Sequence, residues 1–447
     1  MRKLLIVNGW SDLNKGDSGI LFGMINSFMK NRPSIEISLL SEFAKEDRRF
    51  ISGYRHLLDF YPSLKIYGAL LPYTPILHNN KKKELVLTKP RKIALRALYL
   101  IRSLLVLGFP SLGRIFLTKE ERNSLETIKT ADLIVSKGGH IFYSSGDNLK
   151  SLLGLYHHSY PLLLAVRFGK PFAFYAQSMG PFRGRLSKRF IRWLCSKASL
   201  ITVREEVSKN ILISLGVPEK KIELVPDAAF ALVPSTNTAS RILDAMGIKE
   251  DEKFVGITVR QWFFGKDLKS TNRYQNYLKV MAEFIDYIVE RKNMKVILMP
   301  QVLGPTKEEN DLIASEEVYR LVRQRSKVFL LNKDLSPPSL MSIYGKAYAF
   351  VGTRFHSVIF ALLMGVPAIA ISYFGPKSVG IMKMMGLDDF VLNIEEISLE
   401  MMINKFEILL RDRERIAAYI RKRVENLREE AEKTAALVLQ AATEGWG

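Results

Sequence analysis

The chain has 447 residues, of which 47% are hydrophobic and 25% are charged, a composition typical of a folded globular protein. Because one hydrophobic core rarely serves so long a chain, we expect two domains. The single cysteine, Cys195, excludes an intramolecular disulfide and a cysteine-based zinc site. Lysine and arginine number 66 against 45 aspartates and glutamates, a net charge of +21, which favours a phosphorylated small molecule or an anionic surface as partner. We expect no nucleic-acid partner, because no zinc finger, RRM signature or basic tail is present.

Short apolar runs alternate with amphipathic helical patterns through the first half of the chain. The strand candidates there are Leu4–Asn8, Ile35–Leu40, Leu133–Ser136, Phe172–Ala176, Leu200–Val203 and Ile222–Val225. This alternation predicts a parallel, doubly wound sheet, because each parallel connection needs a crossover helix. Met1 closely precedes the first strand, so we expect no signal peptide and a cytoplasmic location.

The second half repeats this style after Pro234–Ser240, a polar stretch typical of a linker between domains. Its strand candidates are Val255–Val259, Val296–Met299, Val328–Leu331, Ala349–Val351 and Ala368–Ile371. We therefore expect one Rossmann-like domain over 1–235, a second over 236–397 and a C-terminal helical segment over 398–447. The charged pattern of the last segment is typical of a solvated helix docked on one domain.

An insertion at 81–119 departs from the alternation because it is basic and apolar together, with no carboxylate between Leu85 and Leu117. Its longest apolar run, Ala97–Leu107, is interrupted by Arg102 and is too short to span a bilayer. Such a segment suits the membrane interface, with leucines toward the acyl chains and cations near lipid phosphates. Packing on the protein's own core, with solvated cations, is the alternative. We expect contact with an anionic membrane, and a peripheral position on the inner face of the cell membrane.

Polar or glycine-containing loops follow several predicted strands, at the edge where open α/β sheets bind ligands. They are Asn14-Lys15-Gly16-Asp17, Ser136-Lys137-Gly138-Gly139-His140, Gln177-Ser178-Met179-Gly180-Pro181, Val203-Arg204-Glu205 with Ser208, and Val225-Pro226-Asp227. Glycine lets a ligand approach the backbone, and a lysine or arginine supplies charge for a phosphate or carboxylate. Each loop taken alone is equally typical of an ordinary turn or helix cap.

The segment Gly352–Tyr373 carries the most informative pattern. An apolar strand ends at Gly352, Arg354 and His356 follow at once, and an apolar helical run begins at Ser357. A helix N-terminus after a parallel strand presents N–H groups and the positive end of the helix dipole. Arg354 and His356 therefore indicate a site for an anionic group with a proton donor beside it. An arginine paired with a surface acid and a histidine that caps the helix would give the same pattern.

In this order and spacing, the motifs resemble the polysaccharide pyruvyl transferase family from about Leu4 to Lys377. The stretches ITVREEVSKNILISLGV and RFHSVIFALLMGVPAIAISY carry the resemblance most specifically. The chain departs from the family pattern where Ser18 and Gly19 replace the last two residues of NxGDEA. It departs again where Gly138-Gly139-His140 replaces a GGG cluster.

The resemblance implies two Rossmann-like domains that face each other across a cleft, a glycosyltransferase-B-like arrangement. It implies transfer of the pyruvyl group of phosphoenolpyruvate to a sugar of a bacterial surface polysaccharide or its lipid-linked precursor. The product is a cyclic ketal, and no further cofactor or metal is expected. His356 matches the family's histidine and would be the general acid–base group. Arg354 and Arg204 match family arginines and would bind the donor's carboxylate or phosphate.

Other residues are expected at the substrates because they belong to the matching motifs or follow strands. The expected substrate-binding set is Asn14, Asp17, Lys137, Gly138, Gly139, Gln177, Ser178, Arg204, Arg260 and Lys377. Asn14 and Asp17 would face the cleft from the first domain. Asp17 would orient an acceptor hydroxyl or only cap its helix.

Two other functions remain open at this point. A nucleotide-sugar-dependent glycosyltransferase would use the same scaffold, with Arg354 and a glycine loop on the diphosphate, although no clear E-x₇-E pattern supports it. A non-catalytic, membrane-bound assembly protein for polysaccharide export would explain the charge and the insertion at 81–119. It would not explain the motifs at the strand ends.

Overall fold

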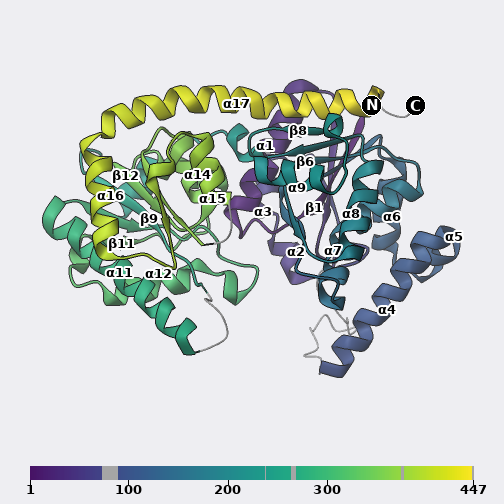
Figure 1. Ribbon diagram of the computed structural model, residues 1–447, viewed down its shortest axis with the longest axis horizontal. Coiled ribbons are helices and arrows are strands. Elements are labelled where there is room, and N and C mark those ends of the chain that lie inside the picture. The colour runs from purple at the N-terminus through teal and green to yellow at the C-terminus, as the bar shows by residue number, and fades with distance from the viewer. Residues whose placement is uncertain (73–88, 237, 263–267, 374–376, 445–447) are drawn as a thin grey trace. The chain divides into compact units, whose positions relative to one another are not determined.

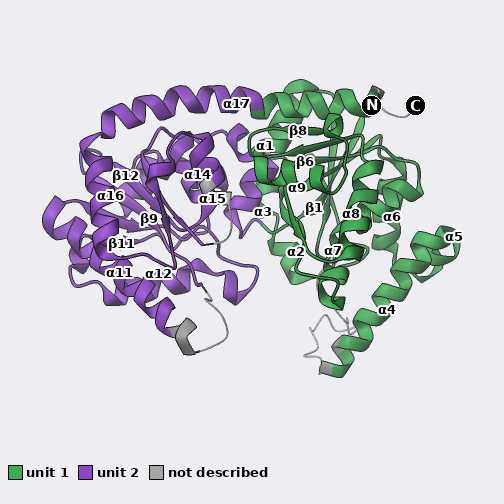
Figure 2. Ribbon diagram, viewed as in Figure 1, with its two compact units in different colours: residues 1–11, 24–228, 431–447 green, residues 12–23, 229–430 purple. Residues whose placement is uncertain are grey.

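The computed structural model describes residues 1–72, 89–236, 238–262, 268–373 and 377–444 (Figure 1). The chain forms two compact units, each built on one parallel sheet (Figure 2). Unit 1 comprises Met1–Ser11, Met24–Ala228 and Ala431–Gly447, and unit 2 comprises Asp12–Gly23 and Ala229–Glu430. Two helices, α1 (Lys15–Asn31) and α17 (Arg413–Glu444), therefore have residues in both units.

The sheet of unit 1 has the strand order β3-β2-β1-β4-β6-β7-β8, with β5 beside β6, and every pair is parallel. Its strands are β1 (Lys3–Gly9), β2 (Glu36–Ser41), β3 (Lys65–Tyr67), β4 (Leu133–Ser136), β5 (Gly139–Ser144), β6 (Phe172–Phe182), β7 (Leu200–Val203) and β8 (Ile222–Leu224). All six strands predicted in this half are present. The prediction missed β3 and β5 because their segments are only partly buried and carry apolar runs of at most three residues.

The sheet of unit 2 has the parallel order β11-β10-β9-β12-β13-β14, which is the strand order of the Rossmann fold. Its strands are β9 (Phe254–Thr258), β10 (Lys295–Leu298), β11 (Val328–Leu330), β12 (Ala349–Gly352), β13 (Ala368–Ser372) and β14 (Val391–Asn393). The five predicted strands are confirmed, and β14 was missed. Every residue of β4 and of β12 is buried, as expected when helices cover both faces of a parallel sheet.

Helices connect the strands within each unit. Those within unit 1 are α2 (Arg48–Ser52), α3 (Arg55–Phe60), α4 (Lys89–Gly108), α5 (Pro110–Gly113), α6 (Lys119–Thr130), α7 (Leu149–Arg167), α8 (Arg185–Lys197) and α9 (Glu206–Ser214). Those within unit 2 are α10 (Thr238–Ala245), α11 (Leu268–Lys292), α12 (Asp311–Leu321), α13 (Pro337–Tyr344), α14 (Phe355–Leu363), α15 (Lys377–Met384) and α16 (Leu399–Arg411). Single helical turns of the 3₁₀ type occur at several junctions, among them η1 (Arg114–Phe116).

The insertion predicted at 81–119 lies partly outside the described residues, and its described part forms α4, α5 and η1. One stripe of α4 packs inward: Leu95 and Val106 are buried, and the Ser103 hydroxyl is 2.9 Å from the Tyr156 hydroxyl of α7. Arg102, between them, pairs with Glu121. The segment is therefore fixed on unit 1 along one face, as the packing alternative expected, while its other face stays exposed.

The charged pattern at the C-terminus forms α16 and the 32-residue helix α17. Buried residues recur at one-turn spacing along one stripe of α17, among them Ile416, Ile420, Val424, Leu427, Ala431, Ala435 and Val438. We expected this helix to dock on one domain. Instead its residues are divided between the two units.

Candidate active site

The loop that opens α1 belongs to unit 2, although its strand, β1, belongs to unit 1. Asn14 forms an antiparallel bridge with Val302, and the N–H of Lys15 donates to the carbonyl of Gln301 at 3.2 Å. These contacts join residues almost 290 positions apart, so local sequence could not predict them. Asn14 and Asp17 therefore lie in unit 2, with the second sheet. The sequence had suggested that they belong to the first domain.

The side chains of Asn14 and Asp17 bond to each other. The Asn14 amide donates to Asp17 Oδ2 at 2.8 Å, and the N–H of Asp17 donates to Asn14 Oδ1 at 3.2 Å. This reciprocal pair closes the first turn of α1. The geometry is that of a cap, so the capping role of Asp17 is present whether or not it also orients an acceptor.

Gly16 of α1 and His356 of α14 approach each other within unit 2. A methyl group added at Gly16 would lie 2.5 Å from His356 Nδ1 and 2.9 Å from His356 Cβ. A second glycine repeats the pattern one turn later, because a Cβ at Gly19 would meet the Phe360 ring at 2.6 Å. The two glycines thus let α1 and α14 touch, and they join the first and last predicted motifs into one site.

The N-terminus of α14 is fixed by β9. The hydroxyl of Thr258, at the end of β9, accepts the N–H of Thr353 at 3.2 Å and of Arg354 at 3.4 Å. It also lies 2.8 Å from the hydroxyl of Ser357. His356 is therefore held in the first turn of a well-anchored helix, half-buried, at the carboxyl edge of the sheet.

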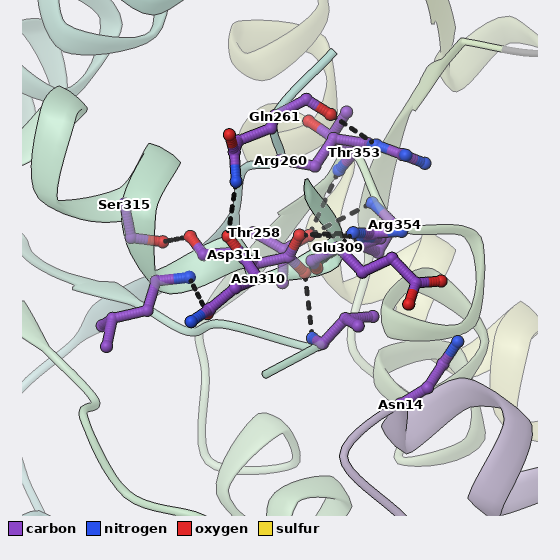
Figure 3. A network of polar contacts seen from close by, with 12 residues as sticks. Asn14, Thr258, Arg260, Gln261, Glu309, Asn310, Asp311, Ser315, Thr353 and Arg354 are labelled. Carbon is purple, nitrogen blue, oxygen red and sulfur yellow. Dashed lines mark hydrogen bonds and ion pairs between the residues drawn. The ribbon is translucent and has the colours of Figure 1, made fainter. Parts of the chain in front are cut away.

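The guanidinium of Arg354 is paired with the buried carboxylate of Asp311. Its Nε lies 2.9 and 3.0 Å from the two Asp311 oxygens, and its Nη2 lies 2.6 Å from Oδ1 (Figure 3). Burial acts to lower the pKa of Arg354, but the Asp311 carboxylate outweighs burial, so the pKa is raised and the guanidinium stays charged. Asp311 Oδ2 also accepts the N–H of Val302, which links this pair to the residue that faces Asn14.

Arg260, just beyond β9, forms no ion pair with any residue that the structure describes. Its guanidinium carbon lies 4.0 Å from the centre of the Tyr373 ring and 5.2 Å from that of Trp262. Burial lowers the pKa of Arg260, and the neighbouring Arg354 lowers it further. Of the two predicted site arginines in unit 2, Arg354 is paired with a carboxylate, whereas Arg260 has no carboxylate partner among the described residues.

Glu309 and Lys15 lie in this site, and the sequence analysis did not select them. The carboxylate of Glu309 points toward Asn14 (Figure 3), and burial and the nearby Asp17 raise its pKa. Lys15 is buried beside Asp334, and burial lowers its pKa despite that pairing. Lys15 opens α1 within a motif that the sequence analysis noted, and Glu309 ends the 3₁₀ turn Lys307–Glu309, but only the three-dimensional contacts identify their side chains as part of this site.

The motifs of unit 1 form a second cluster. The Arg204 guanidinium donates to the Ser178 hydroxyl at 2.7 Å and pairs with the fully buried Asp227. Glu205 accepts from the hydroxyls of Ser178 and Ser208 at 3.0 and 2.6 Å. Three predicted loops therefore interlock, but the Arg204 side chain is only 3% exposed and already satisfied by Asp227. Its role toward the donor stays a prediction.

The remaining candidates of unit 1 are also buried. Gln177 lies inside β6, which runs on to Phe182 instead of ending at Ala176, and its amide donates to the Ser136 hydroxyl at 3.1 Å. Lys137 is 1% exposed.

Gly138 follows Lys137, and Gly139 opens β5 with a φ of +150°, a conformation that favours glycine. Lys377 of unit 2 begins α15, and its side chain lies outside the described residues.

Comparisons with known proteins agree with this architecture. The chain is 25% identical over 448 residues to the amylovoran biosynthesis protein AmsJ of Erwinia amylovora, covering 98% of this chain and 99% of that one. Its fold is similar to that of the UDP-GlcNAc 2-epimerase of Neisseria meningitidis bound to UDP-GlcNAc, with a TM-score of 0.59, 13% identity and complete coverage of both chains. Anabaena Alr3699/HepE in complex with UDP-glucose gives a TM-score of 0.55 at 13% identity and 99% coverage of each chain.

The likeness to these solved structures concerns the fold alone, which is the GT-B-like arrangement of two parallel α/β sheets with a long C-terminal helix. The sequence evidence is more specific. The family model for polysaccharide pyruvyl transferase matches residues 14–375, from the Asn14 loop to a point just beyond β13, the strand that follows α14. The chain belongs to the polysaccharide pyruvyl transferase family.

Proposed function

We propose that the protein transfers the pyruvyl group of phosphoenolpyruvate to two hydroxyls of a sugar, in a bacterial surface polysaccharide or its lipid-linked precursor. The observation that supports this most is the position of His356, packed against Gly16 in the first turn of α14. A proton-transfer group thus lies at a helix N-terminus, and the guanidinium of Arg260, whose pKa is lowered by burial and by the nearby Arg354, adds a cation to the same unit. Transfer from phosphoenolpyruvate, a small anion, requires a proton-transfer group and a group that binds negative charge.

The reaction divides into steps that these residues suit. A proton added to the methylene carbon leaves positive charge on the neighbouring carbon, which one sugar hydroxyl attacks as its own proton departs. The bond from that carbon to the phosphate oxygen then breaks, and a second hydroxyl closes the ketal. His356 delivers the first proton and accepts one from a hydroxyl. Arg260 and the first turn of α14 hold the carboxylate or the phosphate as it leaves.

For Arg354 we propose a positioning role in place of direct donor binding. Because Asp311 already occupies its guanidinium, Arg354 positions the loops around Thr353 and Val302 and adds only part of its charge to the site. Arg260→Ala should therefore weaken donor binding more directly than Arg354→Ala. The exposed Arg241 of α10 gives a matched control, since Arg241→Ala also removes one cation from unit 2.

The donor assay separates the alternatives. Incubation with phosphoenolpyruvate and lipid-linked sugars should release phosphate, and His356→Ala should abolish the release while thermal stabilisation by phosphoenolpyruvate remains. Arg260→Ala should lose that stabilisation, whereas Arg241→Ala should keep it. Sugar transfer from a UDP-sugar would establish the glycosyltransferase alternative. Absence of turnover with every donor and acceptor would favour a non-catalytic assembly protein.

We further propose that α4, α5 and η1 hold the enzyme on an anionic membrane, where a lipid-linked acceptor would be found. None of the helices in the described part of the chain combines the length and apolar character of a membrane span. The outer face of the segment nevertheless exposes large apolar side chains at Ile93, Leu98, Ile101, Leu104, Phe109, Leu112, Ile115 and Phe116. A helix that is apolar outside as well as inside requires a further apolar partner.

The charges of this face favour lipid as that partner. Arg91 and Arg96 are exposed among the apolar side chains, as is Arg114, which also lies 3.8 Å from Glu126 of α6, and no carboxylate occurs between Leu85 and Leu117. Each such cation adds about 1 kcal/mol of attraction to an anionic surface, and salt weakens it. The apolar side chains add an attraction that salt does not screen.

Liposome co-sedimentation tests the membrane proposal. Binding should rise with anionic lipid content, fall in salt without vanishing, and drop in Ile101→Glu. Ile51→Glu, at another exposed isoleucine, on α2, should bind as the native protein does. If the native protein stays in the supernatant with anionic vesicles at low salt, the membrane proposal fails. Self-association that Ile101→Glu abolishes would then identify a second copy of the chain as the partner.

A further inference from the structure

Unit 1 contains a cluster of two histidines and a glutamate that the proposed reaction does not use. Glu42 directly follows β2 at the carboxyl edge of the sheet, and His157 and His158 lie next to each other in α7. One ligand atom from each of the three residues lies within 4.8 Å of the other two. The Glu42 side chain is 7% exposed and the two imidazoles 13% and 17%, so the cluster is a largely enclosed group.

The two imidazoles converge on one carboxylate. His157 Nε2 contacts Glu42 Oε2, and His158 Nδ1 lies 3.2 Å from Glu42 Oε1. Successive residues of a helix diverge by roughly 100°, so adjacent histidines do not ordinarily meet at one point. Here their rings stand nearly perpendicular, at 77°, with centres 4.9 Å apart, which directs a nitrogen of each toward Glu42.

A second layer of hydrogen bonds orients the carboxylate. The Asn8 amide donates to Glu42 Oε1 and to the carbonyl of His158, each at 2.9 Å, and the Ser136 hydroxyl donates to Asn8 Oδ1 at 2.9 Å. Asn8 has a φ of +63°, a left-handed conformation that asparagine adopts more readily than most other residues. Outer hydrogen bonds of this kind position the ligands of metal sites.

The cluster also borders a space of suitable size for one more ligand. A cavity of about 20 Å³ adjoins Glu42 and His157, and its other walls include Leu70, Tyr160 and Pro161. This volume accommodates one water molecule. Two imidazoles, one carboxylate and one water are the ligands of an open, tetrahedral zinc-type site.

We propose that Glu42, His157 and His158 bind one divalent transition-metal ion of the zinc type, with a water molecule in the fourth position. With both imidazoles neutral the cluster carries one negative charge, which a divalent cation compensates. The site lies at the edge of the unit 1 sheet, and none of its three ligands has a role in the reaction proposed for unit 2. This inference is independent of the proposed function.

The test uses the full-length protein after removal of metal with a chelator. Titration with Zn²⁺ in a calorimeter should show one equivalent bound, and Co²⁺ should give the visible absorption of a tetrahedral ion. His157→Ala and His158→Ala should weaken Zn²⁺ binding at least 10-fold and remove the Co²⁺ spectrum. His140→Ala alters another half-buried histidine of unit 1, one that contacts the carbonyl of Gly180, and should leave both measurements unchanged.

Glu42→Gln guards against loss of folding, because it keeps the shape of the side chain while removing its charge. A thermal melt of each variant without metal should match that of the native protein to within a few degrees, and Zn²⁺ should raise the melting temperature of the native protein and His140→Ala only. The proposal is wrong if Zn²⁺ fails to bind the native protein, or if it binds Glu42→Gln and His157→Ala as tightly as it binds the native protein. The cluster would then be a hydrogen-bond network only.

Discussion

Replacement of Gly16 by alanine tests whether the contact between α1 and α14 is needed for catalysis. The added methyl would lie 2.5 Å from His356 Nδ1, about 0.9 Å closer than ordinary contact allows. Rotation of the imidazole cannot relieve the clash fully, because His356 Cβ would also lie 2.9 Å away. We therefore expect α14 and its histidine to shift by somewhat less than 1 Å, at a cost of about 1–3 kcal/mol in the free energy of unfolding.

A misplacement of this size in a catalytic group can reduce turnover by about 10²-fold. Phosphate release under saturating phosphoenolpyruvate measures the loss in Gly16→Ala, and urea unfolding measures the stability. Gly154→Ala is the control, because a Cβ at this position in α7 meets no atom within 4 Å. The double variant Gly16→Ala/His356→Ala should be no less active than His356→Ala alone. Near-native turnover in Gly16→Ala would show that catalysis does not depend on this close approach.

Three further predictions concern buried charges and the thiol. Arg354→Ala should lower the free energy of unfolding by about 3–5 kcal/mol, because it leaves Asp311 buried without its partner. Arg320→Ala, at an exposed arginine of α12, should lower it by less than about 1 kcal/mol. Equal losses of the two variants in urea unfolding would contradict the buried pair. Burial raises the pKa of Glu309, so between pH 4.5 and that raised pKa the folded state holds more protons than the unfolded state, and stability falls as pH rises. Glu309→Gln should flatten this decline when thermal melts are recorded across that pH range. An unchanged slope would contradict the raised pKa of Glu309. Burial raises the pKa of Cys195 to about 12, so the native protein should resist a thiol reagent at pH 8 and react only when unfolded. Rapid labelling of the native protein would contradict this burial.

The sequence predicted those parts of the fold that depend on local pattern. Strands β4 and β12 are continuous apolar runs buried on both faces, and the pattern located them to within one residue. Strand β3 has three residues at the edge of its sheet and is only partly buried, so it lacked a comparable signal. The domain limits at 235 and 397 stay predictions.

The candidate site was predictable only in part, because its geometry depends on contacts between distant segments. Arg354 and His356 were selected correctly as neighbours at a helix N-terminus. The pattern could not reveal Asp311, whose buried carboxylate pairs with the Arg354 guanidinium. Nor could it show that Gly16 faces His356, since 340 residues separate them in the chain. A glycine in a loop motif has many explanations until its neighbour in space is known.

The division of the chain between the units has a consequence for how the protein can be dissected. Unit 1 is discontinuous: the chain leaves it after Ser11 and again after Ala228, and it returns at Met24 and finally at Ala431. The last return contributes Glu432, whose carboxylate pairs with Lys30 at 2.6 Å and whose carbonyl accepts from the Asn31 amide at 2.9 Å. A fragment ending near residue 235 would therefore lack part of its own unit, and adding back the C-terminal helix as a separate peptide should restore it.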